Sequence, residues 1–318
     1  MTAAPALWCV APGRAELRPG RLGEGVPVEM LYSGISRGTE RLVLEGRVPE
    51  SERTRMRCPA QEGDFPFPVK YGYGAVGRIA AGDGEGRVVF ALHPHQARFR
   101  LPAEALHPLP DGLPPGRAVL GANMETALNL LWDSGASAGD RIAVVGAGVV
   151  GALTAHLAAR LPGAEVTLVD VNPDRAALAR DLGCRFAPPE DAPRECDRVL
   201  HLSATAAGLA TALACAGEEA TVVEGSWHGA GETPVPLGGS FHSRRLRIVG
   251  SQVGRLPADR VPRWSHARRL AKALELLLDP VLDGLVSGET PFAELPDRYG
   301  AILADPATLC HRVRYEAA

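Results

Sequence analysis

The chain has 318 residues, of which 46% are hydrophobic and 22% are charged, and its formal net charge is −3. This balance is typical of a globular protein and excludes a disordered chain, while the length predicts two domains. The slightly negative charge argues against nucleic acid as the main partner.

The six cysteines are scattered and form no C-x-x-C pair. They are Cys9, Cys58, Cys184, Cys196, Cys215 and Cys310. This spacing predicts free, buried thiols rather than a zinc knuckle or a redox pair. The N-terminus turns polar too soon for a signal peptide. The most apolar stretch, residues 143–161, includes His156, Arg160 and three glycines, which favours a buried strand and helix over a membrane span. We therefore expect a cytoplasmic protein without a membrane partner.

Three regions differ in their patterns. Residues 1–120 are rich in Gly and Pro and contain short β-type runs, for example 26–32 and 87–92, which predict a compact β-rich domain. Residues 121–255 alternate apolar strands with helices, which indicates a parallel α/β sheet. Residues 256–318 hold a helical stretch at about 263–278 and short segments that return to the first domain.

A glycine motif in the second region follows a predicted strand at 141–145 and opens a helix that continues to about 160. Gly146, Gly148 and Gly151 form G-x-G-x-x-G, and Asp170 ends the next predicted strand, 165–169. This order of strand, glycines, helix and acid is the dinucleotide fingerprint of a Rossmann sheet. Asn172-Pro173 is expected to begin the next helix. Further strands are predicted at 198–202, 219–223 and 245–249.

The physical role of each position supports this interpretation. Gly146 permits the tight turn, Gly148 lets a pyrophosphate approach the backbone, and Gly151 lets helix and strand pack closely. Asp170 would accept hydrogen bonds from the ribose hydroxyls and repel a 2′-phosphate, so NAD(H) is favoured, and Arg175 keeps NADP(H) open. The predicted cofactor contacts are Gly146, Gly148, Val149, Val150, Gly151, Asp170, Val171, Arg175 and Ser203. A flavin is disfavoured because its fingerprint usually lies near the N-terminus, and a ligand-free glycine turn is the remaining alternative.

The order of these regions, together with the segments Ser33–Glu40, Gly72–Gly77 and Gly139–Arg141, resembles the medium-chain dehydrogenase/reductase superfamily over the whole chain. The resemblance implies a GroES-like β-rich catalytic domain beside a Rossmann doubly wound parallel sheet, with the active site in the cleft between them.

The zinc ligands of that family are replaced here. Ser36-Arg37 stands where zinc-dependent members carry a Cys, and Tyr73 stands in place of a His. Glu125 is a possible remnant of the third ligand. The four-cysteine zinc lobe is also missing, since the chain runs from Phe90 almost directly into residues 92–96. We therefore predict neither catalytic nor structural zinc.

The phrases SGISRGTE, QEGDFPFPVKYGYGAVG, LHPHQ, NMETALNLLWD and FHSRRL resemble the bacteriochlorophyllide a dehydrogenase branch of the superfamily. This resemblance implies oxidation, with NAD, of a hydroxyethyl substituent on a chlorin ring. Other substrates within the branch stay open.

Without zinc, a hydrogen-bond donor must stabilise the substrate oxygen and a proton acceptor must accompany it. Candidate groups are Tyr73, His93, His95, Glu40 and Glu125. Each also has a structural alternative: an aromatic packed in the core, a loop brace, or an acid paired with an arginine. His228 either lines the nicotinamide pocket or is a loop residue, and the run 241–245 binds an anionic substrate or forms a solvated edge.

The leading hypothesis is a zinc-independent oxidoreductase that transfers a hydride between NAD(H) and a secondary alcohol or ketone, including a substituent on a larger ring. The alternatives are an NADPH-dependent enone or quinone reductase and a non-catalytic dinucleotide-binding homologue. The expected partners are a small-molecule substrate and, through an exposed edge of the Rossmann sheet, a second copy of the chain.

Overall fold

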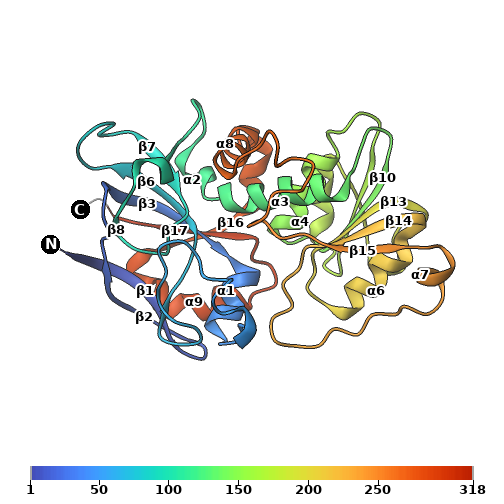
Figure 1. Ribbon diagram of the computed structural model, residues 1–318, viewed down its shortest axis with the longest axis horizontal. Helices are drawn as coiled ribbons and strands as arrows, with labels where there is room; N and C mark the ends of the chain where they lie inside the picture. Colours follow the sequence, from blue (N-terminus) through green and yellow to red (C-terminus); the bar gives the residue numbers. More distant parts are fainter. Residues whose placement is uncertain (1, 317–318) are drawn as a thin grey trace. The chain divides into compact units, whose positions relative to one another are not determined.

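The computed structural model describes residues 2–316 of a chain that divides into two units (Figure 1). The first unit consists of the residues up to Ala122 and those from Leu270 onward, and the second unit consists of Asn123–Arg269. The sequence placed these boundaries at 120/121 and 255/256. The later boundary lies further along the chain because Arg269 is held inside the second unit, where its guanidinium donates to Glu125 Oε1 (3.0 Å) and Asn129 Oδ1 (2.5 Å).

A seven-stranded sheet, counted within the described residues, is the main element of the first unit. Its strands are β3 (Val26–Ser36), β6 (Gly74–Ile79), β7 (Val88–Ala91), β8 (Arg98–Leu101), β9 (His107–Pro108), β16 (Val286–Pro291) and β17 (Cys310–Arg314). The order is β16-β17-β3-β6-β7-β9, and β8 also pairs with β3. The last two strands of the chain therefore extend the sheet that the first ninety residues begin.

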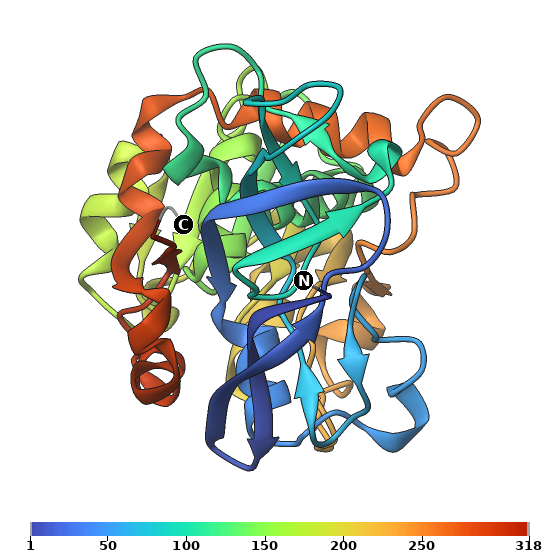
Figure 2. The same cartoon turned by 90° about the vertical axis from the view of Figure 1, so that its left-hand side faces the viewer.

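A smaller antiparallel sheet completes the β structure of this unit. It consists of β1 (Ala3–Ala11), β2 (Arg14–Arg21), β4 (Glu62–Gly63) and β5 (Val69–Lys70), in the order β2-β1-β5-β4. The β1–β2 hairpin is the dark blue pair of strands in Figure 2. The helices of the unit are α1 (Arg37–Leu44), α2 (Pro115–Ala118) and α9 (Leu295–Ala304), with short 3-10 turns at Glu50–Glu52, Ala103–Ala105, Pro280–Leu285 and Phe292–Glu294.

A parallel sheet of six strands forms the second unit, all of whose residues the structure describes. Its strands are β10 (Arg141–Val145), β11 (Glu165–Val169), β12 (Arg185–Ala187), β13 (Cys196–His201), β14 (Ala216–Glu224) and β15 (Arg247–Gly250). The order β12-β11-β10-β13-β14-β15 corresponds to 3-2-1-4-5-6 along the chain, which is the Rossmann order. The strand order reverses between β10 and β13, and ligands of such sheets bind at the carboxyl ends of the strands at that point.

The helices that connect these strands are α4 (Val149–Ala158), α5 (Arg175–Asp181), α6 (Ala206–Cys215) and α7 (Ser240–Ser243), with a 3-10 turn at Pro189–Asp191. Two further helices, α3 (Gly121–Ser134) and α8 (His266–Leu276), each begin in one unit and end in the other.

The predicted strands at 141–145 and 165–169 are confirmed as β10 and β11, because strands covered on both faces give continuous apolar runs. The predicted start of a helix at Asn172-Pro173 is wrong, since α5 begins at Arg175. Asn172 Oδ1 accepts from the backbone N–H of Asp174 (3.0 Å) and so forms a turn that precedes the helix.

The cysteines are free and buried, as the spacing predicted. Four of them, Cys9, Cys58, Cys196 and Cys310, have a pKa raised to about 12, chiefly by burial, so they stay protonated and pack as small apolar groups. Among residues 2–316, no helix combines the length and the apolar character that crossing a membrane requires.

Candidate functional site

The glycine turn, residues 146–151, joins β10 to α4 at the carboxyl edge of the parallel sheet. Gly146 has a φ of +110°, and a Cβ placed on it would lie 2.7 Å from the backbone of Leu202 and Ser203. A Cβ on Gly151 would lie 1.8 Å from Gly146 O. Both positions therefore require glycine, one for its backbone conformation and the other for the close packing of helix on strand.

The first turn of α4 is the part of the glycine turn that is suited to an anion. Gly148 is the N-cap residue and supplies no side chain to bond the N–H groups of Val149, Val150 and Gly151. A Cβ on Gly148 would meet no atom within 4 Å, so the space in front of these groups is open. Unpaired N–H groups at the positive end of a helix, with open space before them, fit a pyrophosphate.

Asp170 lies directly after β11 and supports the same turn. Its Oδ2 accepts from the backbone N–H of Ala147 (2.6 Å), and its Oδ1 accepts from that of Asn172 (2.8 Å). The next residue, Val171, is 83% exposed, and Arg175 is half-buried at the start of α5. The structure thus places the predicted ribose acceptor, an exposed apolar side chain and an arginine within six residues of one another.

Ser203 follows β13 and is joined to a pair of residues that the sequence analysis did not single out as functional. Its Oγ lies 2.7 Å from His201 Nε2 and 3.0 Å from Thr205 Oγ1. His201 Nδ1 lies 2.5 Å from Glu224 Oε2. His201 and Glu224 are the last residues of two adjacent parallel strands and pair in register. The available signal was a polar residue at or next to the end of each of the two predicted strands 198–202 and 219–223.

In the first unit, two of the predicted catalytic residues belong to a buried hydrogen-bond network, which we call the Glu40 network: Ser33, Glu40, His95, Tyr299 and Tyr315. Glu40 Oε2 accepts from Tyr299 (2.6 Å) and from His95 Nε2 (3.0 Å), and Glu40 Oε1 accepts from the backbone N–H of Ser36 (2.7 Å). His95 Nδ1 lies 2.7 Å from Ser33 Oγ, which lies 3.0 Å from the Tyr315 hydroxyl.

Each donor in this network meets an acceptor when Tyr315 donates to Ser33, Ser33 donates to His95 Nδ1, and His95 Nε2 donates to Glu40. Ser33, Glu40 and His95 are fully buried. Burial and the Glu40 charge also raise the pKa of Tyr299 well above its ordinary value. The network therefore ties β3, α1 and α9 together inside the unit, and Glu40 and His95 have no exposed surface through which to contact a substrate.

His93 is also buried, with 2% of its surface exposed. Its ring stacks on Phe99 at a centroid distance of 4.0 Å, and its Nδ1 lies 2.9 Å from Pro94 O. Burial lowers the pKa of His93 to about 3, so the ring is neutral near pH 7. A stacked, neutral imidazole of this kind braces the loop.

Glu125 lies on α3 and forms a buried ion pair, since its Oε1 accepts from Arg269 Nε at 3.0 Å. Burial raises the pKa of Glu125, and the charge of Arg269 opposes that rise. The geometry matches the structural alternative considered for this residue, an acid paired with an arginine.

Tyr73 is the one predicted catalytic residue that is half-buried rather than buried in the described structure. It directly precedes β6, and its ring packs edge-on against Tyr71. Burial, followed by the charge of Glu40, raises the pKa of Tyr73 to about 12, while hydrogen bonds to the side chains of Ser36 and Thr39 act in the opposite direction. The hydroxyl is therefore a neutral donor near pH 7.

The positions at which zinc-dependent members of the superfamily that the sequence resembles carry their ligands hold groups that do not suit that ion. Ser36 ends β3 and gives its backbone N–H to Glu40, and Arg37 Nε donates to Leu303 O (3.1 Å). A hydroxyl, a guanidinium and the phenol of Tyr73 are poor zinc ligands.

Comparison with known proteins supports the dinucleotide-binding unit and the fold. The sequence family described as alanine dehydrogenase/PNT, C-terminal domain, matches residues 134–223. The whole chain is similar to L-idonate 5-dehydrogenase from Escherichia coli, with a TM-score of 0.77 and 15% identity over 98% of this chain and 99% of that one.

Two further solved structures contain a nicotinamide cofactor. One is a short chain alcohol dehydrogenase from Escherichia coli complexed with NADH (TM-score 0.76, 14% identity, 100% of both chains). The other is an oxidoreductase from Salmonella enterica in complex with NADP (TM-score 0.70, 18% identity, 99% of this chain and 100% of that one). The predicted fold class, α/β with a GroES-like β-rich domain and a Rossmann doubly wound parallel sheet, is confirmed.

Proposed function

We propose that the protein is an NAD(P)-dependent oxidoreductase that transfers a hydride between NAD(H) and a secondary alcohol or ketone without a catalytic zinc ion. The main support is the glycine turn, where open N–H groups, the space at Gly148 and the carboxylate of Asp170 meet at the reversal of strand order. The two neighbours solved with NADH and NADP add to this support. When bound, the cofactor supplies or takes up the hydride.

We assign the stabilisation of the substrate oxygen to Tyr73. Its hydroxyl replaces the family's histidine ligand and keeps its proton near pH 7, and Tyr73 is the only predicted catalytic residue within residues 2–316 that is half-buried rather than buried. In the reduction direction the hydroxyl donates to the oxygen on which charge develops. Glu40 acts indirectly, because its charge helps to hold the proton on Tyr73.

Replacing Asp170 should change the cofactor preference. Asp170→Ala removes the carboxylate that would accept from the ribose hydroxyls and repel a 2′-phosphate, so the ratio of NADPH to NADH affinity should rise at least about tenfold. Calorimetric Kd values for both cofactors measure this ratio.

Because Asp170 also accepts from two backbone N–H groups, Asp170→Asn is the companion variant. It keeps an acceptor oxygen, removes the charge, and should move the ratio in the same direction. An unchanged ratio in both variants would remove Asp170 from the ribose site.

Replacing Tyr73 should affect turnover rather than cofactor binding. With an alcohol that the wild type oxidises, Tyr73→Phe should lower kcat about 100-fold or more while the Kd for NADH changes less than about twofold. Tyr32→Phe is the matched control, since Tyr32 is also a half-buried tyrosine of the first unit.

The pH profile offers a second readout for Tyr73. A raised pKa means that the neutral donor is present below the ordinary tyrosine value and is lost only as the pH approaches about 12. The wild type should therefore show no Tyr73-dependent fall in kcat near pH 10. If Tyr73→Phe and Tyr32→Phe turned over equally well, the donor would be another group.

A substrate panel separates the remaining alternatives. Turnover of secondary alcohols with NAD, including a hydroxyethyl group on a tetrapyrrole ring, supports the proposal. Turnover confined to enones or quinones with NADPH would replace it with the reductase alternative. Tight NADH binding without any turnover would replace it with a non-catalytic role.

We further infer a cytoplasmic homodimer that pairs through edge strand β15. Sedimentation analysis would detect this dimer as twice the chain mass.

A further inference from the structure

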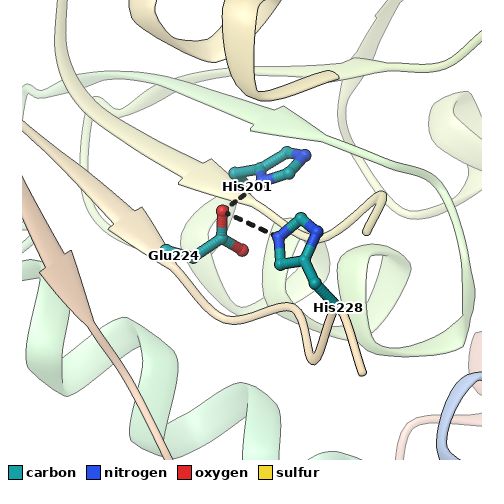
Figure 3. A group of neighbouring side chains, drawn as sticks. All are labelled: His201, Glu224 and His228. Atoms are coloured by element: carbon teal, nitrogen blue, oxygen red, sulfur yellow. Dashed lines mark hydrogen bonds and ion pairs between the residues drawn. The ribbon is translucent and has the colours of Figure 1, made fainter. Parts of the chain in front are cut away.

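A second group of polar side chains lies at the carboxyl edge of the parallel sheet, and we call it the histidine–glutamate cluster: His201, Glu224 and His228. His201 ends β13, Glu224 ends β14, and His228 follows four residues later in the loop after β14. Figure 3 shows the two imidazoles beside the Glu224 carboxylate, each joined by a dashed line to the same carboxylate oxygen.

The potential ligand atoms of the cluster converge. His201 Nδ1 lies 2.5 Å from Glu224 Oε2, and His228 Nε2 lies 3.5 Å from the same oxygen. One ligand atom from each residue lies within 4.8 Å of the other two. His201 is fully buried, whereas Glu224 and His228 expose 18% and 19% of their side chains, so the cluster is enclosed but accessible from the loop side.

Each imidazole is oriented by a hydroxyl at its other nitrogen. Ser203 Oγ lies 2.7 Å from His201 Nε2, and Thr233 Oγ1 lies 3.0 Å from His228 Nδ1. Glu224 Oε1 is fixed by the backbone N–H of Ser226 at 2.8 Å. Metal-binding histidines are typically oriented in this way, because the outer partner sets the tautomer and turns the free nitrogen toward the ion.

Within the cluster, His228 Nε2 is left without a hydrogen-bond partner by the described residues. It is buried and forms no hydrogen bond in the described structure, although it faces the Glu224 carboxylate. Ligand atoms of a tetrahedral zinc ion lie roughly 3.4 Å apart, given metal–ligand distances near 2.1 Å. The distance of 3.5 Å between His228 Nε2 and Glu224 Oε2 is already close to this value. The hydrogen bond between His201 and Glu224 must lengthen by roughly 0.9 Å, as it would when an ion enters between the two groups.

We propose that His201, Glu224 and His228 bind one divalent first-row transition ion, and we take Zn²⁺ as the ion. Two imidazoles and one carboxylate suit Zn²⁺, whereas Mg²⁺ and Ca²⁺ prefer oxygen ligands. When His201 Nδ1 binds the ion, the ring proton lies on Nε2. His201 Nε2 then donates a hydrogen bond to Ser203 Oγ. Three protein ligands leave a fourth position for water or a small oxygen ligand.

This site is distinct from the family's zinc positions, which belong to the first unit and hold Ser36, Arg37 and Tyr73. It also does not depend on the proposed hydride transfer, because its test needs neither substrate nor cofactor.

The test uses the full chain, stripped of metal with a chelator and titrated with ZnCl₂ in a calorimeter. We expect one Zn²⁺ per chain with a Kd in the micromolar range or tighter. His228→Ala and Glu224→Gln should each weaken binding at least 100-fold. His242→Ala, which removes an exposed histidine of the same unit, should bind as the wild type does.

Titration with CoCl₂ identifies the ligands in a second way. Cobalt in a site of two histidines and a carboxylate gives d–d absorption without thiolate-to-cobalt charge transfer, whereas capture by a cysteine would give the charge-transfer band. Circular dichroism confirms that each variant is folded, and His228 is the primary variant because it lies in a loop, unlike the fully buried His201.

Absence of saturable Zn²⁺ binding by the wild type would overturn the proposal. So would equal binding by the His228→Ala and His242→Ala variants, or a thiolate charge-transfer band that survives in the cluster variants.

Discussion

Replacing Gly148 by aspartate should change stability and cofactor binding in opposite directions. Asp is a better N-cap than Gly, and a Cβ at this position meets no other atom, so α4 should be capped and the free energy of unfolding should rise by a few tenths to about 1 kcal/mol. The new carboxylate would occupy the space in front of the N–H groups of Val149, Val150 and Gly151. NADH affinity should therefore fall about 100-fold, or ~2.7 kcal/mol.

Calorimetry with NADH and thermal unfolding measured on the same preparation test this prediction. Gly238→Asp is the matched control, since Gly238 is exposed in the same unit and a Cβ there also meets no atom within 4 Å. The control should bind NADH as the wild type does. If Gly148→Asp kept wild-type affinity, the pyrophosphate would not lie at the N-terminus of α4 and the cofactor assignment would fail.

Glu40→Ala should be the most destabilising of the substitutions considered for the first unit. It leaves the backbone N–H of Ser36, the Tyr299 hydroxyl and His95 Nε2 without their acceptor in a fully buried place. Breaking a buried charged network by removing one partner costs about 3–5 kcal/mol. At about 2–4 °C per kcal/mol for a unit of this size, Tm should fall by roughly 6–20 °C.

Thermal and urea unfolding without ligand measure this loss. Glu40→Gln keeps one acceptor oxygen and should lose less than Glu40→Ala, and Glu45→Ala, which removes an exposed carboxylate paired with Arg41 and Arg47, should change stability by less than about 1 kcal/mol. If Glu40→Ala unfolded at the wild-type temperature but lost turnover, Glu40 would act in the chemistry rather than in holding the unit together.

The glycine turn around Gly148 and the Glu40 network differ in how well they can be predicted from the sequence. The proposed cofactor site consists of consecutive elements: β10, the glycine turn, α4, β11 and Asp170 follow one another within about thirty residues. Gly146 is required by its positive φ, and Gly151 is required because a side chain there would collide with Gly146 O. Such requirements depend only on residues close together in the sequence, so the motif can be predicted from the sequence alone.

The roles of Glu40, His93 and His95 depended on tertiary structure. The sequence marked them as polar residues in conspicuous segments, and polar residues in loops are candidates for chemistry. Their surroundings are supplied by distant parts of the chain, since Glu40 meets Tyr299 across 259 positions and Ser33 meets Tyr315 across 282. Only folding decides whether such a carboxylate faces a substrate or a buried tyrosine, because burial and pairing arise from packing rather than from local pattern.

The parallel sheet, the glycine turn and the acid at its edge can be predicted from the sequence, because each depends on neighbouring residues. The tertiary structure decided that Glu40 and His95 are enclosed, that Tyr73 keeps an exposed surface, and that His201 and His228 converge on Glu224. These outcomes need strands and loops from separate parts of the chain to meet, and the free energy of burial and pairing that brings them together is a property of the whole fold.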